Sequence, residues 1–225
     1  MPGPYRGGVE MRVSDDPAAE AGRWLAQRLG DAVRRRGHAF VAVSGGSSAP
    51  PMFDAVLAHD VPWEEVTIWQ VDERVAPDGH PARNAAQLAD LPCRIELMPV
   101  TDDDLAAGAA RYAAGLPDTF DVVHLGLGGD GHTASWPPGH DVVDSDLACV
   151  AIGEFNGFAR MTLTPSVVNA ARARLMLISG TAKASMVQRW VLGDESLPVA
   201  RVRRTDTCVM LDLAAAAELP DPSAR

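Results

Sequence analysis

Residues 39–58 read AFVAV SGGSS APPMFDAVLA: a short apolar run, a serine–glycine loop and a segment that opens with prolines. Five consecutive apolar residues at 39–43 are typical of a buried strand. Pro50 and Pro51 favour the start of a helix, expected over residues 52–58, because proline is tolerated in the first helical turn. The stretch therefore predicts a strand–loop–helix unit, the building block of a parallel sheet.

The same alternation continues on both sides of this stretch. Upstream, Asp15-Asp16-Pro17 and Gly37 have the residue types that begin and end a helix. Repeated strand–helix units predict an α/β fold whose mostly parallel sheet is covered on both faces. The expected strands downstream are 66–71, 94–98, 120–127, 147–152, 160–163, 174–179 and 207–211, and the expected helices are 84–91, 103–114, 165–171 and 181–192.

Length and composition indicate one folded domain over residues 1–225. The chain has 225 residues, 47% of them hydrophobic and 22% charged, which is enough for a full core and short for two domains. No apolar run approaches the ~18 residues that cross a bilayer, and residues 1–8 lack the apolar core of a signal peptide. Cys93, Cys149 and Cys208 lie far apart and are expected to be reduced thiols. We therefore expect a cytoplasmic protein without a membrane partner.

The charge balance bears on partners. Thirty acidic and twenty basic residues give a formal net charge of −10, and the only basic clusters are 34–36 and Arg201 with Arg203-Arg204. Nucleic-acid binding needs a concentrated basic face, so no nucleic-acid partner is expected. A small anionic ligand would have to be bound by a few well-placed cations and backbone amides.

Three polar loops follow predicted strands, and in a parallel sheet such loops share one edge, where ligands bind. The first is Ser44-Gly45-Gly46-Ser47. Glycines let the backbone approach a ligand, and the following helix start offers amides and a positive dipole end, which suits a phosphate. The alternative is a flexible strand-to-helix turn without a ligand.

The second loop is Asp72-Glu73-Arg74. Arginine stays charged and presents a fork of donors, so Arg74 suits an anionic group or a developing oxyanion, with Asp72 or Glu73 holding the fork. The three charges are also compatible with a strand that simply emerges into solvent.

The third loop contains Gly126, Gly128 and Gly131, which match the dinucleotide-binding pattern GxGxxG. A dinucleotide site requires a long helix next, whereas the segment 136–139, Trp-Pro-Pro-Gly, interrupts the chain. What remains is a glycine loop presenting Asp130 and His132. Imidazole suits proton transfer near neutral pH, and a carboxylate two residues away can orient it. The alternative is an ordinary exposed histidine.

Three further residues complete the list of candidates. Arg160 begins a predicted strand and Lys183 lies near a predicted helix start, so both are candidate phosphate contacts or, alternatively, surface residues. His124 lies inside an apolar strand and is expected to be a core residue with its hydrogen bonds satisfied. No histidine or cysteine spacing matches a metal-ligand signature, so no metal is expected.

Taken together, these motifs resemble the 6-phosphogluconolactonase family, within a larger group that includes the glucosamine-6-phosphate deaminases. The resemblance runs from Val41 to Trp190. It rests on Ser44-Gly45-Gly46-Ser47, on Asp72-Glu73-Arg74 followed by Asn84, on residues 125–135 with Pro138-Gly139, on residues 160–164, and on Gly180 with Lys183.

The resemblance implies a single-domain, three-layer, modified Rossmann-like fold. It also implies hydrolysis of 6-phospho-D-glucono-1,5-lactone, with His132, Asp130 and Arg74 catalytic and no cofactor. Ser44, Gly45, Gly46, Ser47, Arg160 and Lys183 would bind the substrate phosphate, and Asp72, Glu73 and Asn84 would support them. The partner would be the small sugar phosphate, and the protein a monomer or weak homodimer.

Two alternatives remain. The deaminases resemble Asp-Glu-Tyr in the second loop and have a Glu shortly after the histidine, whereas this chain has Arg74 and the Trp136-Pro137-Pro138 segment, which favours a lactonase. A non-catalytic sugar-phosphate sensor would not need a base beside Asp130. The chain also departs from the family at Ser48-Ala49-Pro50, at Arg83, expected to add a cation near the phosphate, and at Trp136, expected to reshape the pocket rim.

Overall fold

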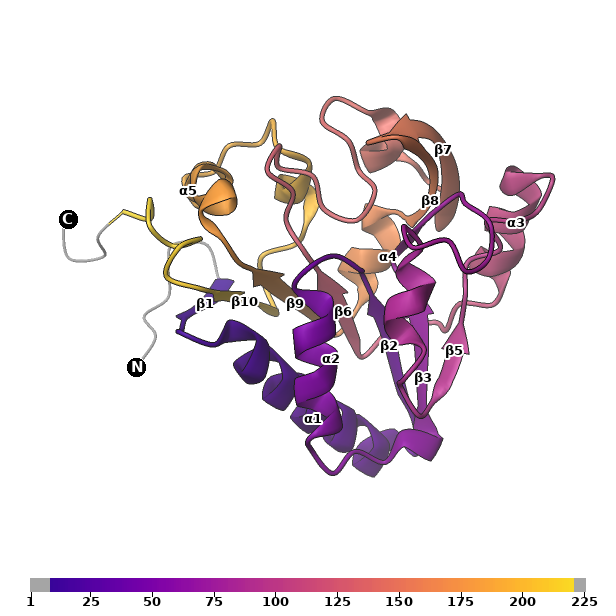
Figure 1. The fold of residues 1–225 in the computed structure, drawn as a ribbon, viewed down its shortest axis with the longest axis horizontal. Helices are drawn as coiled ribbons and strands as arrows, with labels where there is room; N and C mark the ends of the chain where they lie inside the picture. Colours follow the sequence, from indigo (N-terminus) through magenta and orange to yellow (C-terminus); the bar gives the residue numbers. More distant parts are fainter. Residues whose placement is uncertain (1–8, 221–225) are drawn as a thin grey trace.

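The computed structural model describes residues 9–220, so residues 1–8, expected to contain no signal-peptide core, lie outside it. Its centre is a seven-stranded sheet, ordered β1-β10-β9-β6-β2-β3-β5, in which every neighbouring pair is parallel (Figure 1). The strands are β1 (Val9–Val13), β2 (Ala39–Val43), β3 (Val66–Gln70), β5 (Arg94–Glu96), β6 (Val122–Leu125), β9 (Ala173–Ile178) and β10 (Thr207–Leu211).

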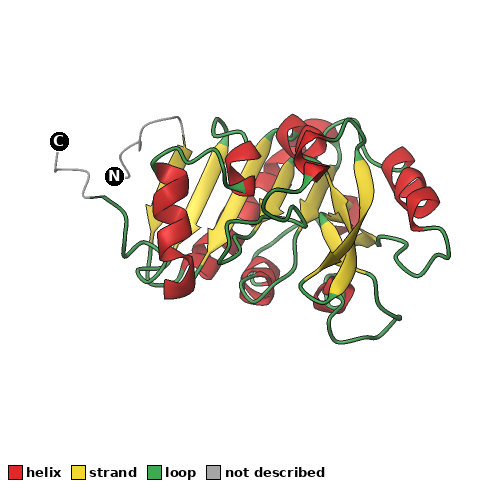
Figure 2. Ribbon diagram, turned by 90° about the horizontal axis from the view of Figure 1, so that it is seen from above, coloured by secondary structure: helices red, strands yellow, loops and turns green. Residues whose placement is uncertain are grey.

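Helices lie on both sides of this sheet (Figure 2). They are α1 (Pro17–Arg36), α2 (Ala49–Leu57), α3 (Leu105–Ala114), α4 (Pro165–Ala170) and α5 (Ala184–Val191). Leu29 of α1 and Phe53 of α2 pack in one core with Val41. Tyr112 of α3 and Trp190 of α5 belong to a second core. These two cores on opposite faces confirm the predicted three-layer α/β arrangement.

A second, three-stranded antiparallel sheet is ordered β4-β8-β7. Its strands are β4 (Asp72–Arg74), β8 (Phe158–Leu163) and β7 (Cys149–Phe155). Because β4 follows β3 after a single residue, this small sheet stands at the carboxyl edge of the main sheet. It supplies one wall of the site described below.

The predicted ends of α1 are confirmed. The Asp16 side chain accepts a hydrogen bond from the Ala19 amide at 3.0 Å, and Pro17 is the first helical residue. Gly37 ends the helix with φ of 78°, a left-handed conformation that glycine adopts without steric cost. The capping residues therefore lie at the two ends of α1, as the helix-capping rules predict.

Several elements differ from expectation. The strand β1 was not predicted, and Asp72–Arg74, expected as a loop, forms β4 because it pairs with β8. The segment expected as a helix over 84–91 is a short 3₁₀ helix, Asn84–Leu88. Within residues 9–220, no helix combines the length and apolarity needed to cross a membrane.

Candidate active site

A cavity of about 410 Å³ opens at the carboxyl ends of β2, β6 and β9, facing the small sheet. Of the predicted site residues, all except Glu73 and Asp130 line it. The sheet therefore brings the three predicted loops to one edge, as the carboxyl-end rule requires. The residues that line it include Ser44, Gly45, Gly46, Ser47, Asp72, Arg74, Asn84, His124, His132, Asn156, Arg160 and Lys183.

His132 is held by Asp130. Nδ1 of His132 lies 2.5 Å from Oδ1 of Asp130, which also accepts the His132 backbone N–H at 3.1 Å. Partial burial opposes ionisation of Asp130, but hydrogen bonds from His132 and its charge outweigh burial and lower the pKa of that carboxyl. An ionised Asp130 fixes the proton on Nδ1, so Nε2 is the nitrogen available to accept one.

Glycines allow the close packing of this loop. A side chain at Gly128 would come within 2.0 Å of Nδ1 of His132, and Gly131 has φ of +87°. Phe155 at the end of β7 meets the His132 ring edge-on, with ring centroids 5.0 Å apart. The imidazole is thus fixed from two sides, while its side chain stays 26% exposed and lines the cavity.

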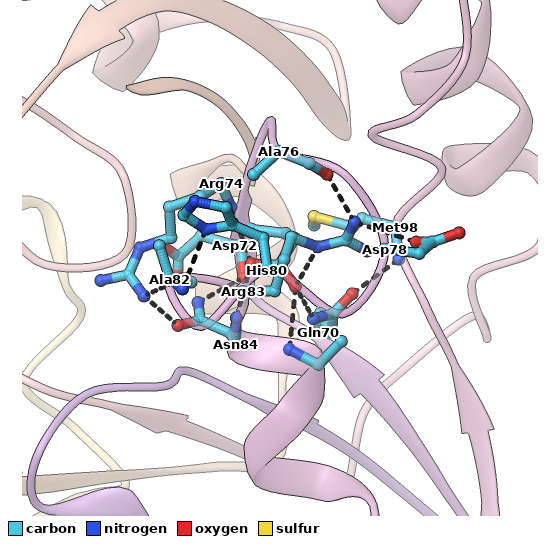
Figure 3. Close-up of polar contacts among 12 residues, drawn as sticks. Gln70, Asp72, Arg74, Ala76, Asp78, His80, Ala82, Arg83, Asn84 and Met98 are labelled. Atoms are coloured by element: carbon cyan, nitrogen blue, oxygen red, sulfur yellow. Dashed lines mark hydrogen bonds and ion pairs between the residues drawn. The ribbon is translucent and has the colours of Figure 1, made fainter. Parts of the chain in front are cut away.

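Arg74 is held by an amide and a carbonyl. Its Nη1 donates to Oδ1 of Asn84 at 2.6 Å and to the carbonyl of Ala82 at 2.8 Å (Figure 3). Asn84 is fixed in turn, because its Nδ2 donates to the Asp72 carbonyl at 2.9 Å. The expectation that Asp72 or Glu73 holds the fork is therefore wrong: among residues 9–220 neither carboxylate hydrogen-bonds the Arg74 guanidinium.

Glu73 instead ties β4 to the following loop. Its side chain is fully buried and accepts the backbone N–H groups of Arg74, Asn84 and Ala85 at 2.8, 2.7 and 2.9 Å. Arg83 forms a buried ion pair with it, Nε to Oε2 at 3.1 Å. This carboxylate positions the backbone that carries both Arg74 and Asn84.

Arg83 does not supply a cation to the cavity. Its Nη1 donates to the carbonyl of Ala76 at 2.8 Å and lies 3.1 Å from Asp78. Figure 3 shows the guanidinium groups of Arg74 and Arg83 on opposite sides of the cluster. The expectation of an added cation near the phosphate is wrong, because the buried Glu73 carboxylate draws Arg83 inward.

Arg160 lies directly opposite Arg74 in the pairing of β8 with β4. Its Nε and Nη2 donate to the Phe155 carbonyl at 3.1 and 2.9 Å. Burial and then the charge of Arg74 lower the pKa of the Arg160 guanidinium. Two neighbouring guanidiniums make this wall strongly cationic, although the chain as a whole is acidic.

Lys183 also lines the cavity, at the end of the short 3₁₀ helix Thr181–Lys183 that follows β9. A side chain at Gly129 would come within 3.8 Å of its Nζ, so the ammonium lies next to the loop that carries His132.

Asp72 is the one carboxylate in the cavity lining among the described residues. Its Oδ2 accepts a hydrogen bond from the Ser135 hydroxyl at 2.8 Å.

The first loop offers fewer free amides than its sequence suggests. Pro50 and Pro51 have no N–H, the Gly46 amide donates to Gln87 at 3.1 Å, and the Ala49 amide donates to the Gly46 carbonyl at 3.3 Å. Side-chain donors must therefore contribute more to any anion bound here.

Some site residues were not predicted from the sequence, and Trp136 lies elsewhere than expected. Asn156, with φ of 54°, and Phe158 lie at the tip of the β7–β8 hairpin and line the cavity; the Asn156-Gly157 pair was a turn signal. Trp136, expected at the rim, is fully buried and donates from Nε1 to the Leu163 carbonyl at 2.8 Å. It packs the core beneath the site because its indole N–H finds a backbone acceptor there.

His124 is buried as predicted, with 1% of its surface exposed. The expectation that its hydrogen bonds are satisfied is wrong, because neither ring nitrogen has a partner among the described residues. No group of three or more His, Cys, Asp and Glu side chains suited to a metal ion occurs within residues 9–220.

Fold and site together define an α/β protein with a cavity lined by Arg74, Arg160 and Lys183 and with a histidine–aspartate pair at its side. The family model described as glucosamine-6-phosphate isomerases/6-phosphogluconolactonase matches residues 13–211. The chain belongs to this family.

Similar proteins and solved structures agree with this family membership. The chain is 32% identical to a 6-phosphogluconolactonase of Streptomyces coelicolor, covering 94% of both chains. It is 32% identical to one of Mycobacterium tuberculosis, covering 92% of this chain and 96% of the relative. The crystal structure of a 6-phosphogluconolactonase from Shewanella baltica superposes with a TM-score of 0.82 at 25% identity, covering 93% of this chain and all of the other.

Proposed function

We propose that this protein hydrolyses 6-phospho-D-glucono-1,5-lactone to 6-phosphogluconate, the second step of the oxidative pentose phosphate pathway. Its relatives from Streptomyces coelicolor and Mycobacterium tuberculosis are 6-phosphogluconolactonases. The observation that carries the proposal is the His132–Asp130 pair, 2.5 Å apart, beside a cavity lined by Arg74, Arg160 and Lys183. A base and several cations are what hydrolysis of an anionic ester requires.

The reaction begins when Nε2 of His132 takes a proton from water and the water oxygen bonds to C1 of the lactone. Arg74 and loop amides stabilise the resulting oxyanion. The C1–ring oxygen bond then breaks, and protonated His132 gives its proton to the leaving oxygen. General base catalysis typically contributes about 10²–10⁴-fold and an oxyanion donor about 10²–10³-fold. The lactone is a reactive ester, so no covalent nucleophile is needed.

The phosphate lies, in this proposal, between the Ser44-Gly45-Gly46-Ser47 loop, Arg160 and Lys183, which line the same cavity. Binding energy from this remote group positions the reacting carbonyl. Arg160 is the natural partner for a dianion because the neighbouring Arg74 concentrates positive charge there.

A deaminase needs a further acid close to the base. Asp72 is the one carboxylate among the described lining residues, and it is bonded to Ser135. The segment after His132 provides the buried Trp136 followed by two prolines. Lactone hydrolysis is therefore favoured, and an ammonia-release assay with glucosamine 6-phosphate should show no activity.

We also propose one domain over residues 1–225, a monomer or weak homodimer, and a reducing cytoplasmic setting. Burial raises the pKa of the Cys149 and Cys208 thiols to about 12 and that of Cys93 to about 11, which suits inert reduced thiols. Sedimentation analysis checks the oligomeric state, and thiol titration of the native protein checks that the three thiols are reduced.

Kinetics of His132→Ala test the function. We expect kcat for lactone opening, corrected for spontaneous hydrolysis, to fall by about 10²–10⁴-fold, because the base is lost. His59→Ala, at an exposed position outside the cavity, is the matched control and should keep the native rate. Near-native hydrolysis by His132→Ala would remove this residue from the chemistry.

A further inference from the structure

His124 lies in the middle strand of the main sheet, opposite Val43 of β2 and Leu175 of β9. Its ring meets that of Phe53 in α2 edge-on, with centroids 6.5 Å apart. Although 99% of its surface is covered, the residue borders the cavity. A histidine in such apolar surroundings costs stability unless its ring nitrogens find partners.

Three buried polar atoms at this point of the cavity have no partner within residues 9–220: Nδ1 and Nε2 of His124, and Oγ of Ser44. Buried polar groups in native proteins are nearly always hydrogen-bonded, so a cluster of orphaned ones needs a cause. Both residues line the same cavity, and the Ser44 N–H donates to the His124 carbonyl at 3.1 Å. The two residues that carry the unpaired atoms are therefore neighbours at the carboxyl ends of β2 and β6, where both border the cavity.

The chemistry of these two residues fits an anion. Burial lowers the pKa of the His124 imidazole to about 4, against an opposing contribution from the Ser44 backbone, so the ring is neutral near pH 7 and has one N–H donor. Ser44 adds an O–H donor. The neighbouring loop needs such donors, because two positions of the first turn of α2 are proline and the Gly46 and Ala49 amides are already used.

We propose that His124 is a phosphate-binding residue: one ring N–H donates, beside the Ser44 hydroxyl, to the phosphoryl group of the substrate. This rests on the proposed function, which seats the phosphate in the Ser44–Ser47 loop. In the ligand-free protein both ring nitrogens of His124 stay unpaired, so the residue lowers the stability of the fold until the ligand binds.

The test compares His124→Leu, which keeps a buried apolar shape without donors, with His124→Gln, which keeps an N–H donor. KM and kcat are measured with the phosphorylated lactone, and inorganic phosphate is used as a competitive inhibitor. We expect His124→Leu to raise both KM and the phosphate inhibition constant about tenfold, the usual effect of losing one hydrogen bond to a charged group. The value of kcat should change less than twofold, and His124→Gln should recover part of the affinity.

Thermal melting distinguishes a role of His124 in phosphate binding from a role in packing alone. His124→Leu should melt at or above the native temperature without ligand, because orphaned polar atoms are removed, and should gain less from added phosphate. His59→Leu is the exposed control and should keep the native response to phosphate. If His124→Leu fails to fold, the phosphate inhibition constants of His124→Gln and Ser44→Ala are measured in its place to test the proposal.

A native KM and phosphate inhibition constant in His124→Leu would overturn the proposal and leave His124 a packing residue. That outcome would leave the proposed function intact if the wild-type protein hydrolyses the lactone. If the wild type does not, the proposed function fails, while loss of phosphate-induced thermal stabilisation in His124→Leu would still support His124 as a phosphate ligand.

Discussion

Asp130 sets the chemistry of His132 at the scale of single residues. One carboxylate oxygen, Oδ1, meets both the ring Nδ1 and the backbone N–H of His132. The carboxylate fixes ring orientation and tautomer, and it stabilises the imidazolium that forms when water is deprotonated. Because its side chain is 42% exposed, solvent weakens the charge interaction but leaves the geometric role.

Replacing this orienting group should slow the chemical step. For Asp130→Asn we expect kcat to fall about 10²-fold with little change in KM, because the asparagine amide no longer favours the proton on Nδ1. Steady-state lactone kinetics check this, with the exposed Asp146→Asn as control. A native kcat in Asp130→Asn would show that His132 needs no orienter.

Asp72 gives a prediction about pH. Burial raises its pKa, with the Ser135 hydroxyl and the charges of Arg74 and Arg160 opposing the shift. A carboxyl whose pKa is higher in the folded than in the unfolded protein adds stability below the unfolded pKa, and that stability is lost as the pH rises through the folded pKa.

Wild-type protein should therefore gain free energy of unfolding relative to Asp72→Asn as the pH falls from 7 towards 4. Denaturant unfolding of the two proteins at several pH values measures this difference directly. A constant offset between them over the whole range would mean that Asp72 has an ordinary pKa in the folded protein.

At the scale of elements, the site depends on how β4, the edge strand of the small sheet, is fixed against the first loop. Glu73 binds the backbone of β4 and of residues 84–85, and Asn84 connects Arg74 to the Asp72 carbonyl. Gly45 allows this arrangement, because a side chain there would come within 2.2 Å of Oδ1 of Asn84. The first loop therefore packs against Asn84, which holds Arg74, because Gly45 has no side chain.

Gly45→Ala should displace Asn84 and release Arg74. We expect kcat/KM to fall about 10–100-fold, since an oxyanion donor is mispositioned rather than deleted. Gly153→Ala, where an added side chain meets nothing within 4 Å, is the matched control and should retain activity. Equal activity in the two variants would contradict the role given to this contact.

At the scale of the whole molecule, apolar strand runs and capping residues predicted much of the architecture. Ala39–Val43, the helix between Asp16 and Gly37, and the shared edge of the three loops all follow from local rules. The strand β4 did not, because three charged residues become a strand only when β8 pairs with them. Family membership and the α/β fold agree with the resemblance seen in the motifs.

Side-chain partners were harder to predict than positions. The sequence places Arg83 beside Asn84 but contains no sign that buried Glu73 turns it inward. Trp136 and His124 illustrate the same limit, since whether a polar nitrogen in the core finds an acceptor depends on residues distant in sequence. Such contacts are set by tertiary packing.

The most direct measurement is a crystal structure of the protein with bound 6-phosphogluconate, the product of the proposed reaction. We expect its carboxylate beside Nε2 of His132 and Arg74, and its phosphate in the Ser44–Ser47 loop with Arg160 and Lys183. A product bound in the opposite direction, or with its carboxylate away from His132, would rule out the proposal that His132 activates the water that opens the lactone.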